Sequence, residues 1–130
     1  MTLFLLISLC INDMSGQGSS PMFAGKVLSV NRKEHSVLVK TTNAVAEIYS
    51  YSSTIIRVRI NKTEPKADFS FAVIQQPSPH FRDLVEHRDS TIILTDSLQV
   101  VIYPDPFRIA VRTDNGQLLS VDQPGMPVSW

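Results

Sequence analysis

Acidic side chains are the most numerous groups in this sequence that could carry out acid–base chemistry. Two carboxyl groups at a defined separation can act together, one as a nucleophile or base and the other as a protonated acid. Most of these residues fall in predicted turns, where aspartate accepts backbone hydrogen bonds, and we favour that structural role for Asp96, Asp105 and Asp114. No pair is nominated by spacing among the carboxylates after the N-terminal region, which are Glu34, Glu47, Glu64, Asp68, Asp83, Glu86, Asp89, Asp96, Asp105, Asp114 and Asp122.

A nucleophile, a metal site and a phosphate-binding loop have equally little support in the sequence. The single cysteine, Cys10, lies in an apolar N-terminal run and is a poor candidate for a nucleophile. His35 lies in a predicted turn, while His80 and His87 have no Cys or third His to complete a zinc site. The five glycines are spread singly, so no glycine-rich phosphate loop exists. We therefore predict no catalytic residue, no metal site and no cofactor.

Aromatic side chains could stack on sugar rings or bases. Tyr49 and Tyr51 share one face of a predicted strand, and Phe69 and Phe71 share a face of another. Aromatic residues at a spacing of two on a strand are more often part of the core than of a binding platform, and we favour the core interpretation. Trp130 differs, because it is the last residue and follows a proline-containing stretch.

The composition predicts one globular domain. The chain has 130 residues, of which 43% are hydrophobic and 18% charged. Lys plus Arg and Asp plus Glu each number 12, so no basic field is available to hold nucleic acid, and we predict no such partner. One cysteine excludes an internal disulfide framework.

The N-terminal 22 residues predict a signal peptide and a flexible leader. The apolar run 3–11 is too short for a membrane span, which needs roughly 20 apolar residues, and a small-residue, polar stretch follows it at 15–20. No Lys or Arg precedes the run, which departs from the usual pattern. The alternatives are a frayed apolar tail or a first strand. We expect the protein to be exported, with no membrane span.

From Lys26 onward apolar and polar residues alternate with a period of two, the pattern of half-buried strands. β-branched and aromatic residues fill these runs, as a pleated surface prefers. The clearest run places Ile56, Val58 and Ile60 on one face and two arginines on the other. The predicted strands cover residues 27–30, 36–41, 44–51, 54–60, 69–74, 91–95 and 98–103, and a hairpin follows within 105–121.

Turn residues separate these runs at roughly the 8–12-residue spacing of β-sandwiches. The stretch Asp114-Asn115-Gly116 tolerates positive φ and predicts a tight hairpin turn. Residues 80–88 fit either one short helical turn or an extended segment. Parallel strands would need long crossovers that are missing here. We therefore predict an all-β protein, an antiparallel β-sandwich of eight to ten strands, in one domain at residues 23–130.

The order of several motifs resembles a known family. A strand of alternating isoleucine and arginine is followed by residues 68–74, then 98–102, then 105–111 and then 114–119. This order resembles the N-terminal domain of glycoside hydrolase family 31, which includes α-glucosidases and α-xylosidases. The most specific part is the Pro-Phe-Arg-Ile run at 106–109 with the hairpin and leucine pair after it. The resemblance covers residues 23–130 and implies a sandwich similar to the galactose mutarotase fold.

The resemblance also implies that catalysis belongs to another domain. In that family the nucleophile and the acid/base are aspartates of a catalytic (β/α)8 barrel that follows the sandwich, and no carboxylate here matches those motifs. We therefore expect the non-catalytic N-terminal domain of a retaining α-glycosidase, truncated before the barrel, inactive alone and acting on carbohydrate through the parent enzyme. The loops at 61–68 and 77–88 are where we would look for a wall of the substrate pocket. An exposed apolar patch and self-association are expected of the isolated domain.

Two other functions fit a sandwich. A free-standing carbohydrate-binding or extracellular interaction module would need an aromatic groove, for which Tyr49, Tyr51 and Trp130 are the candidates. An immunoglobulin-like domain is disfavoured, because the cysteine pair and the mid-strand tryptophan are missing. The triplet Asn61-Lys62-Thr63 matches an N-glycosylation acceptor, a short pattern that also arises by chance.

Overall fold

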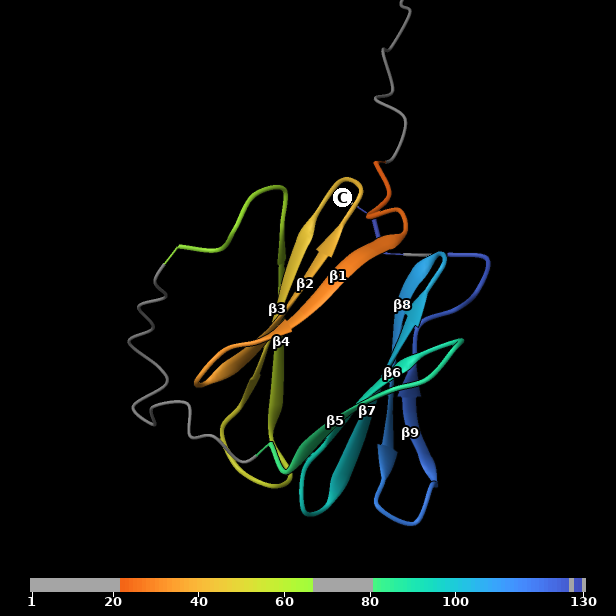
Figure 1. The fold of residues 1–130 in the computed structure, drawn as a ribbon. Helices are drawn as coiled ribbons and strands as arrows, with labels where there is room; N and C mark the ends of the chain where they lie inside the picture. The colour runs from red at the N-terminus through yellow and green to blue at the C-terminus, as the bar shows by residue number, and fades with distance from the viewer. Residues whose placement is uncertain (1–21, 67–80, 127, 130) are drawn as a thin grey trace, which may run out of the picture.

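The computed structural model describes residues 22–66, 81–126, 128 and 129, and within them every regular element is a β-strand. The first sheet contains β1 (Val27–Arg32), β2 (Ser36–Thr41), β3 (Val45–Ser50) and β4 (Ile56–Asn61), and the second contains β5 (Asp83–Glu86), β6 (Thr91–Leu94), β7 (Leu98–Pro104), β8 (Phe107–Thr113) and β9 (Leu118–Val121). Both sheets follow chain order, with every pairing antiparallel. The two sheets stack as the layers of a sandwich (Figure 1).

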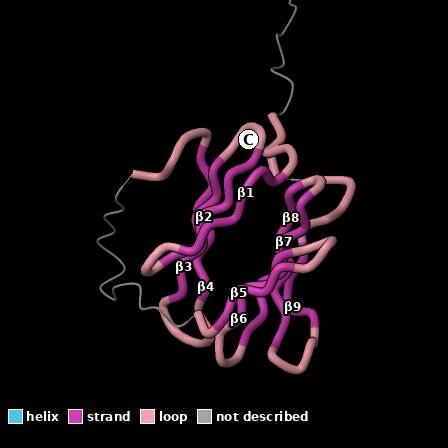
Figure 2. The backbone as a smooth tube through the Cα atoms, in the orientation of Figure 1, coloured by secondary structure: helices cyan, strands magenta, loops and turns pink. Residues whose placement is uncertain are grey.

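The core lies between the two sheets and takes side chains from both. In β2 and β3 alternate residues such as Val37 and Ile48 point inward and are fully buried. Phe107 is the largest fully buried side chain, and it belongs to β8 of the opposite sheet. Because side chains alternate across a strand, each inner face is a continuous apolar surface. Figure 2 shows the strands of the two layers and the loops that join them.

One end of the sandwich is closed by residues 23–26, which we name the bridging segment. Its backbone contacts three separate elements. The Ala24 amide donates to the Val128 carbonyl at 2.9 Å, and the Phe107 amide donates to the Gly25 carbonyl at 2.8 Å. The Ala24 carbonyl accepts the Thr41 hydroxyl at 2.6 Å. The bridging segment therefore ties the first sheet to β8 and to the C-terminal residues.

The other end is held by side chains that donate to backbone carbonyls in segments next to strands of the opposite sheet. The Thr95 hydroxyl accepts from the Leu98 amide at 2.9 Å, which closes the β6–β7 turn, and donates to the Ser53 carbonyl at 2.7 Å. An Arg32 guanidinium nitrogen donates to the Phe81 carbonyl at 2.9 Å. Buried carbonyls need such partners, because a buried backbone group without a hydrogen bond costs free energy.

The architecture agrees with the sequence-based expectation. The sandwich, the antiparallel pairing and nine strands within the described residues match the predicted eight to ten. The Asp114–Gly116 turn joins β8 to β9, with Gly116 at φ +89°. The predicted strand at 69–74 lies outside the described residues. Within the described part of the chain, no helix has the length and apolar character needed to cross a membrane.

The structure adds two details about strands that the sequence pattern left undecided. The ambiguous segment 80–88 is extended where it is described, because β5 pairs with β6 from Asp83 to Glu86. Val58 shares a face with Ile56 and Ile60, as the alternation predicts, because it stands opposite the buried Ile48; it is nevertheless 37% exposed, whereas Ile56 and Ile60 pack against the core. Among the described strands β4 lies at one edge of its sheet, so alternation alone does not decide how well its middle is covered.

Replacing Gly25 by alanine should destabilise the fold. Gly25 has φ +81°, and an added Cβ would approach the Thr42 Cβ to 2.9 Å. We expect a loss of about 1–3 kcal/mol in the free energy of unfolding, measured by urea denaturation. Gly116→Ala has the same backbone strain with open space around it, so its loss should be smaller. Gly125→Ala, with neither feature, is the matched control, and an equal loss there would contradict the explanation.

Candidate functional site

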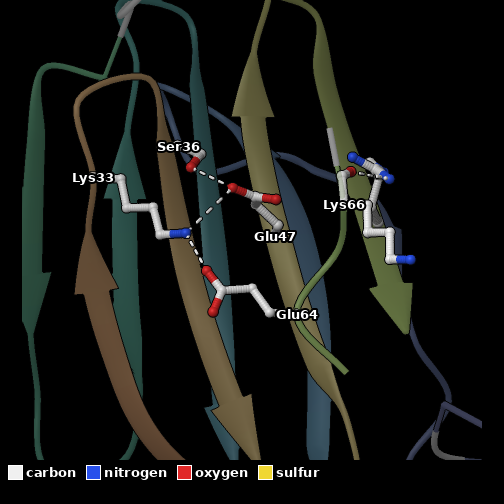
Figure 3. A network of polar contacts seen from close by, with 6 residues as sticks. Lys33, Ser36, Glu47, Glu64 and Lys66 are labelled. Carbon is white, nitrogen blue, oxygen red and sulfur yellow. Dashed lines mark hydrogen bonds and ion pairs between the residues drawn. The ribbon is translucent and has the colours of Figure 1, made fainter. Parts of the chain in front are cut away.

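The outer face of the four-stranded sheet carries a connected set of polar side chains around Glu47. Ala46 and Ile48 point into the core, so Glu47 and Tyr49 point outward from β3. The strand register places Glu47 between Leu38 on β2 and Arg59 on β4. We name this set the Glu47 network; its members are Lys33, Ser36, Glu47, Tyr49, Arg59 and Glu64. Figure 3 labels four of them, Lys33, Ser36, Glu47 and Glu64.

Glu47 is buried although it is charged. Only 6% of the residue is exposed, and its carboxylate accepts the Ser36 hydroxyl at 2.8 Å. The ammonium of Lys33 lies 3.9 Å from the same carboxylate oxygen. A buried carboxylate needs such partners, because removing its charge from water without hydrogen bonds is costly. Glu47 is therefore fixed in place by the turn before β2 and by β2 itself.

Tyr49 extends the network toward β4. Partial burial is the largest cause that raises the pKa of its hydroxyl, and the hydrogen bond to Glu47 is the next; together they bring the pKa to about 12. The nearby Arg59 guanidinium acts in the opposite direction. Ionised tyrosine beside a carboxylate would place two negative charges together. The Tyr49 hydroxyl therefore keeps its proton and donates a hydrogen bond to the Glu47 carboxylate.

A loop after β4 is drawn across this face by Glu64. Its carboxylate lies 2.6 Å from the Lys33 ammonium, and this hydrogen bond raises the pKa of Lys33 and lowers that of Glu64. An Arg59 guanidinium nitrogen donates to the Lys66 carbonyl at 3.1 Å. Figure 3 shows the Lys33 ammonium between the carboxylates of Glu47 and Glu64, and Lys66 farther away, beside β4. The loop at 62–66 is therefore fastened at two points.

The geometry of the Glu47 network supports fastening rather than acid–base catalysis. A general acid would have to keep its proton at neutral pH, which requires a carboxyl pKa raised by burial or by a second negative charge. The carboxylate of Glu64 is 54% exposed and its pKa is lowered by Lys33. Glu47 accepts hydrogen bonds from Ser36 and Tyr49 as a carboxylate does. Neither group is arranged to deliver a proton to a substrate.

The structure places the other sequence candidates apart from one another. Asp96, Asp105 and Asp114 lie in three different hairpin turns, and the carboxylate of Asp114 accepts the Asn115 amide at 2.9 Å. His35 is exposed in the β1–β2 turn. His87 is exposed just after β5. Among residues 22–66, 81–126, 128 and 129, no three His, Cys, Asp or Glu side chains come close enough to hold a metal ion. Cys10 and His80 lie outside the described residues.

The aromatic candidates do not form an open platform. Tyr51 is only 8% exposed, as the core interpretation expects, and Tyr49 is half-buried within the Glu47 network. Phe69, Phe71 and Trp130 lie outside the described residues. Asn61, the asparagine of the acceptor triplet, is exposed at the end of β4. It borders an open depression of about 300 Å³ that is lined by Ile60, Asn61, Lys62, Val128 and Ser129.

Sequence reasoning missed the Glu47 network. The outward direction of Glu47 and Tyr49 follows from alternation in β3, and this was the available signal. Their burial does not follow from it, because an outward glutamate on a strand is normally solvated. The contact between Lys33 and Glu64 joins two loops that are 31 residues apart, and no local pattern encodes it.

One comparison shows the family of this chain, and another shows similar folds. Residues 45–129 match the model of the glycosyl hydrolase 31 N-terminal galactose mutarotase-like domain. The fold is similar to part of a Flavobacterium johnsoniae GH31 dextranase, with a TM-score of 0.69 and 18% identity over 78% of this chain. It is also similar to part of a cycloalternan-forming enzyme from Listeria monocytogenes, with a TM-score of 0.65 and 15% identity over 79% of this chain. The chain spans 13% and 10% of these two proteins. No curated protein matches the sequence.

Removing the Glu47 carboxylate should lower the pKa of Tyr49. In the native protein Tyr49 should remain protonated where ordinary tyrosines ionise, near pH 10, because its pKa is about 12. Glu47→Gln should bring the pKa down but leave it above 10.0, because burial, the larger cause, remains. NMR of ring-labelled tyrosine up to about pH 11 measures this, with circular dichroism to verify the fold. Tyr49→Phe assigns the signal, and an unchanged pKa in Glu47→Gln would contradict the contact.

The ion pair between Lys33 and Glu64 should make a contribution to stability that is lost in acid. The folded-state pKa of Glu64 lies below its ordinary value of 4.5, so the contribution is fully present above pH 4.5 and disappears as the pH falls through the lowered pKa. Urea midpoints of the native protein and Glu64→Gln should therefore differ slightly at neutral pH and converge in acid. Glu86→Gln, at an exposed end of β5, is the control. A difference that grows in acid would refute this assignment.

Proposed function

The chain belongs to the glycosyl hydrolase 31 N-terminal galactose mutarotase-like domain family, and from this premise we propose that it is the non-catalytic N-terminal sandwich of an exported, retaining α-glycosidase. The observation that carries the proposal is the family match over residues 45–129, which runs from β3 to the C-terminal bridge. The small share of the similar enzymes that this chain covers, 10–13%, supports a role as one part of a larger protein.

The division of labour follows from what retaining hydrolysis requires. A covalent glycosyl-enzyme needs a nucleophilic carboxylate roughly 5–5.5 Å from an acid/base carboxyl group. The carboxylates of Glu47 and Glu64 both face the Lys33 ammonium, which lowers the pKa of Glu64. In our proposal the reacting carboxylates belong to a catalytic (β/α)8 barrel domain, and the sandwich contributes a rigid surface that packs against that barrel.

The substrate of the parent enzyme is proposed to be an α-linked carbohydrate. The dextranase from Flavobacterium johnsoniae was solved with isomaltotriose, and the cycloalternan-forming enzyme with a pentasaccharide substrate. At 15–18% identity these proteins support the fold alone, so the α-glucosidase or α-xylosidase type rests on the sequence resemblance. The loop at 62–66, fastened by Lys33 and Arg59, is the described segment that we propose as a wall of the substrate pocket.

Export is proposed from the leader at residues 1–22. Its apolar run has the length of a signal-peptide core. The domain in this proposal comprises residues 23–130. Phe23 supports this boundary, because it forms an antiparallel bridge with Ser129, and the next residue, Ala24, is completely buried. Cleavage before this point would leave the bridging segment intact.

A free-standing carbohydrate-binding or extracellular interaction module has less support. Sugar-binding platforms present the open face of an aromatic ring. Tyr51 is buried and Tyr49 is held within the Glu47 network. Of the three aromatic candidates for the binding-module alternative, the two that the structure describes therefore lack an open ring face.

Sequencing the DNA downstream of the Trp130 codon tests the proposed function. We expect the reading frame to continue, or to resume after one frameshift, into a βα-repeating barrel that carries two catalytic aspartates. The longer protein should then release sugar from an α-glucan or an α-xyloside, while the chain of 130 residues should release none. A clean stop followed by an unrelated gene would refute the domain proposal, and binding to immobilised α-glucans would then be measured.

A further inference from the structure

Strand β9 is an open edge of the five-stranded sheet. Within the described residues it pairs on one side only, with β8. All four of its residues are exposed, with Leu118 at 52%, Leu119 at 56% and Val121 at 44%. Most edge strands cover at least one face against the core, but neither face of β9 is covered. The strand therefore offers free backbone hydrogen-bonding groups and apolar side chains together, which is the combination that pairs with another chain.

The other three edge strands carry features that oppose such pairing. β4 has two arginines, Arg57 and Arg59, and β5 begins and ends with an acidic residue. β1 has an irregular register between Val27 and Ser29. Charges and bulges at an edge are the usual protection against pairing with another sheet. β9 has no charged residue and no proline, and its register with β8 skips Leu119 as that of β1 with β2 skips Leu28, so β9 differs from the other three edges in lacking charge and not in lacking an irregularity.

The neighbouring strands also protect their outer face, and β9 does not. On β7 and β8 the Arg108 guanidinium lies over the ring of Tyr103, 4.8 Å from its centroid. The long arginine side chain covers apolar surface while its charge remains near water. Next to this covered region, Val121 stands opposite Ala110 with 44% of its surface exposed. Among the described strands of this five-stranded sheet, the exposed large apolar side chains all belong to β9.

We propose that β9 of the free chain pairs antiparallel with β9 of a second copy, joining two five-stranded sheets about a twofold axis. A twofold axis places the same strand on both sides, so leucine and valine side chains meet leucine and valine side chains. No ionic group within Leu118–Val121 would be buried or would face a like charge. The formal net charge of the chain is zero, so no long-range repulsion keeps two copies apart.

This pairing does not depend on the glycosidase proposal. The competing occupant of the edge is the remainder of a longer enzyme, which could cover β9 in place of a second copy. The pairing proposed here concerns the chain of 130 residues by itself, with its own edge exposed. Because β9 is only four residues long, the association should be reversible and should depend on concentration.

Sedimentation equilibrium over a wide concentration range tests the pairing. The native chain should reach a dimer, and Leu119→Lys should raise the dissociation constant about tenfold or more, because it places a charge at the paired edge. Leu28→Lys is the matched control, since Leu28 is 62% exposed on β1, another edge strand, and that variant should associate as the native chain does. Circular dichroism verifies that both variants are folded.

Three results would overturn the proposal. These are a native chain that stays monomeric at every concentration, a dimer unaffected by Leu119→Lys, and a dimer weakened equally by Leu28→Lys. Amide hydrogen exchange of residues 117–122 gives an independent answer that needs no variant. In the native chain these amides should exchange more slowly as the concentration rises, and exchange that does not change with concentration would overturn the pairing even if Leu119→Lys failed to fold.

Discussion

The backbone of the bridging segment, residues 23–26, is the constraint on which the stacking of the two sheets depends. Ala24 is completely buried, so its amide and carbonyl must find partners inside the protein, and they find them in Val128 and Thr41. The carbonyl of Gly25 receives the Phe107 amide from the opposite sheet. The left-handed φ of Gly25, with no room for a Cβ beside Thr42, makes this crossing possible. One short segment therefore sets where β8 and the C-terminal residues lie relative to the first sheet.

The far end of the sandwich is held by two side chains that donate across the layers: Thr95 to the Ser53 carbonyl in the β3–β4 loop, and Arg32 to the Phe81 carbonyl just before β5. Both ends are thus fixed, and alternate residues of the strands pack in the core between the sheets. The two sheets differ in how well their outer faces are covered. The first sheet buries Glu47 and its partners beneath a fastened loop, so β2 is buried on both faces through most of its length. The second sheet ends in β9 with both faces exposed. The middle of the first sheet is therefore covered on its outer face, whereas β9 at the edge of the second sheet is exposed on both faces.

This asymmetry bears on function. The side chains of the Glu47 network hold a loop in place, and they satisfy one another's charges and hydrogen bonds instead of leaving a group free for a substrate. In our proposal this family 31 N-terminal domain contributes surfaces to the parent enzyme and no reacting group. The fastened loop is one such surface and the β9 edge is another. Both are products of long-range packing around a core that many β-sandwiches could share.

The sequence by itself determined most of the described strands, their antiparallel pairing and the Asp114–Gly116 turn, because alternation and turn chemistry act between near neighbours. The motif order was also enough to indicate the family. Only the tertiary structure decided that residues 83–86 pair as a strand, that Val58 is exposed and that Glu47 is buried. It also decided the contact of Lys33 with Glu64. These outcomes depend on which strands become edges and which loops cross a sheet face, and those are set by contacts between residues far apart in the chain.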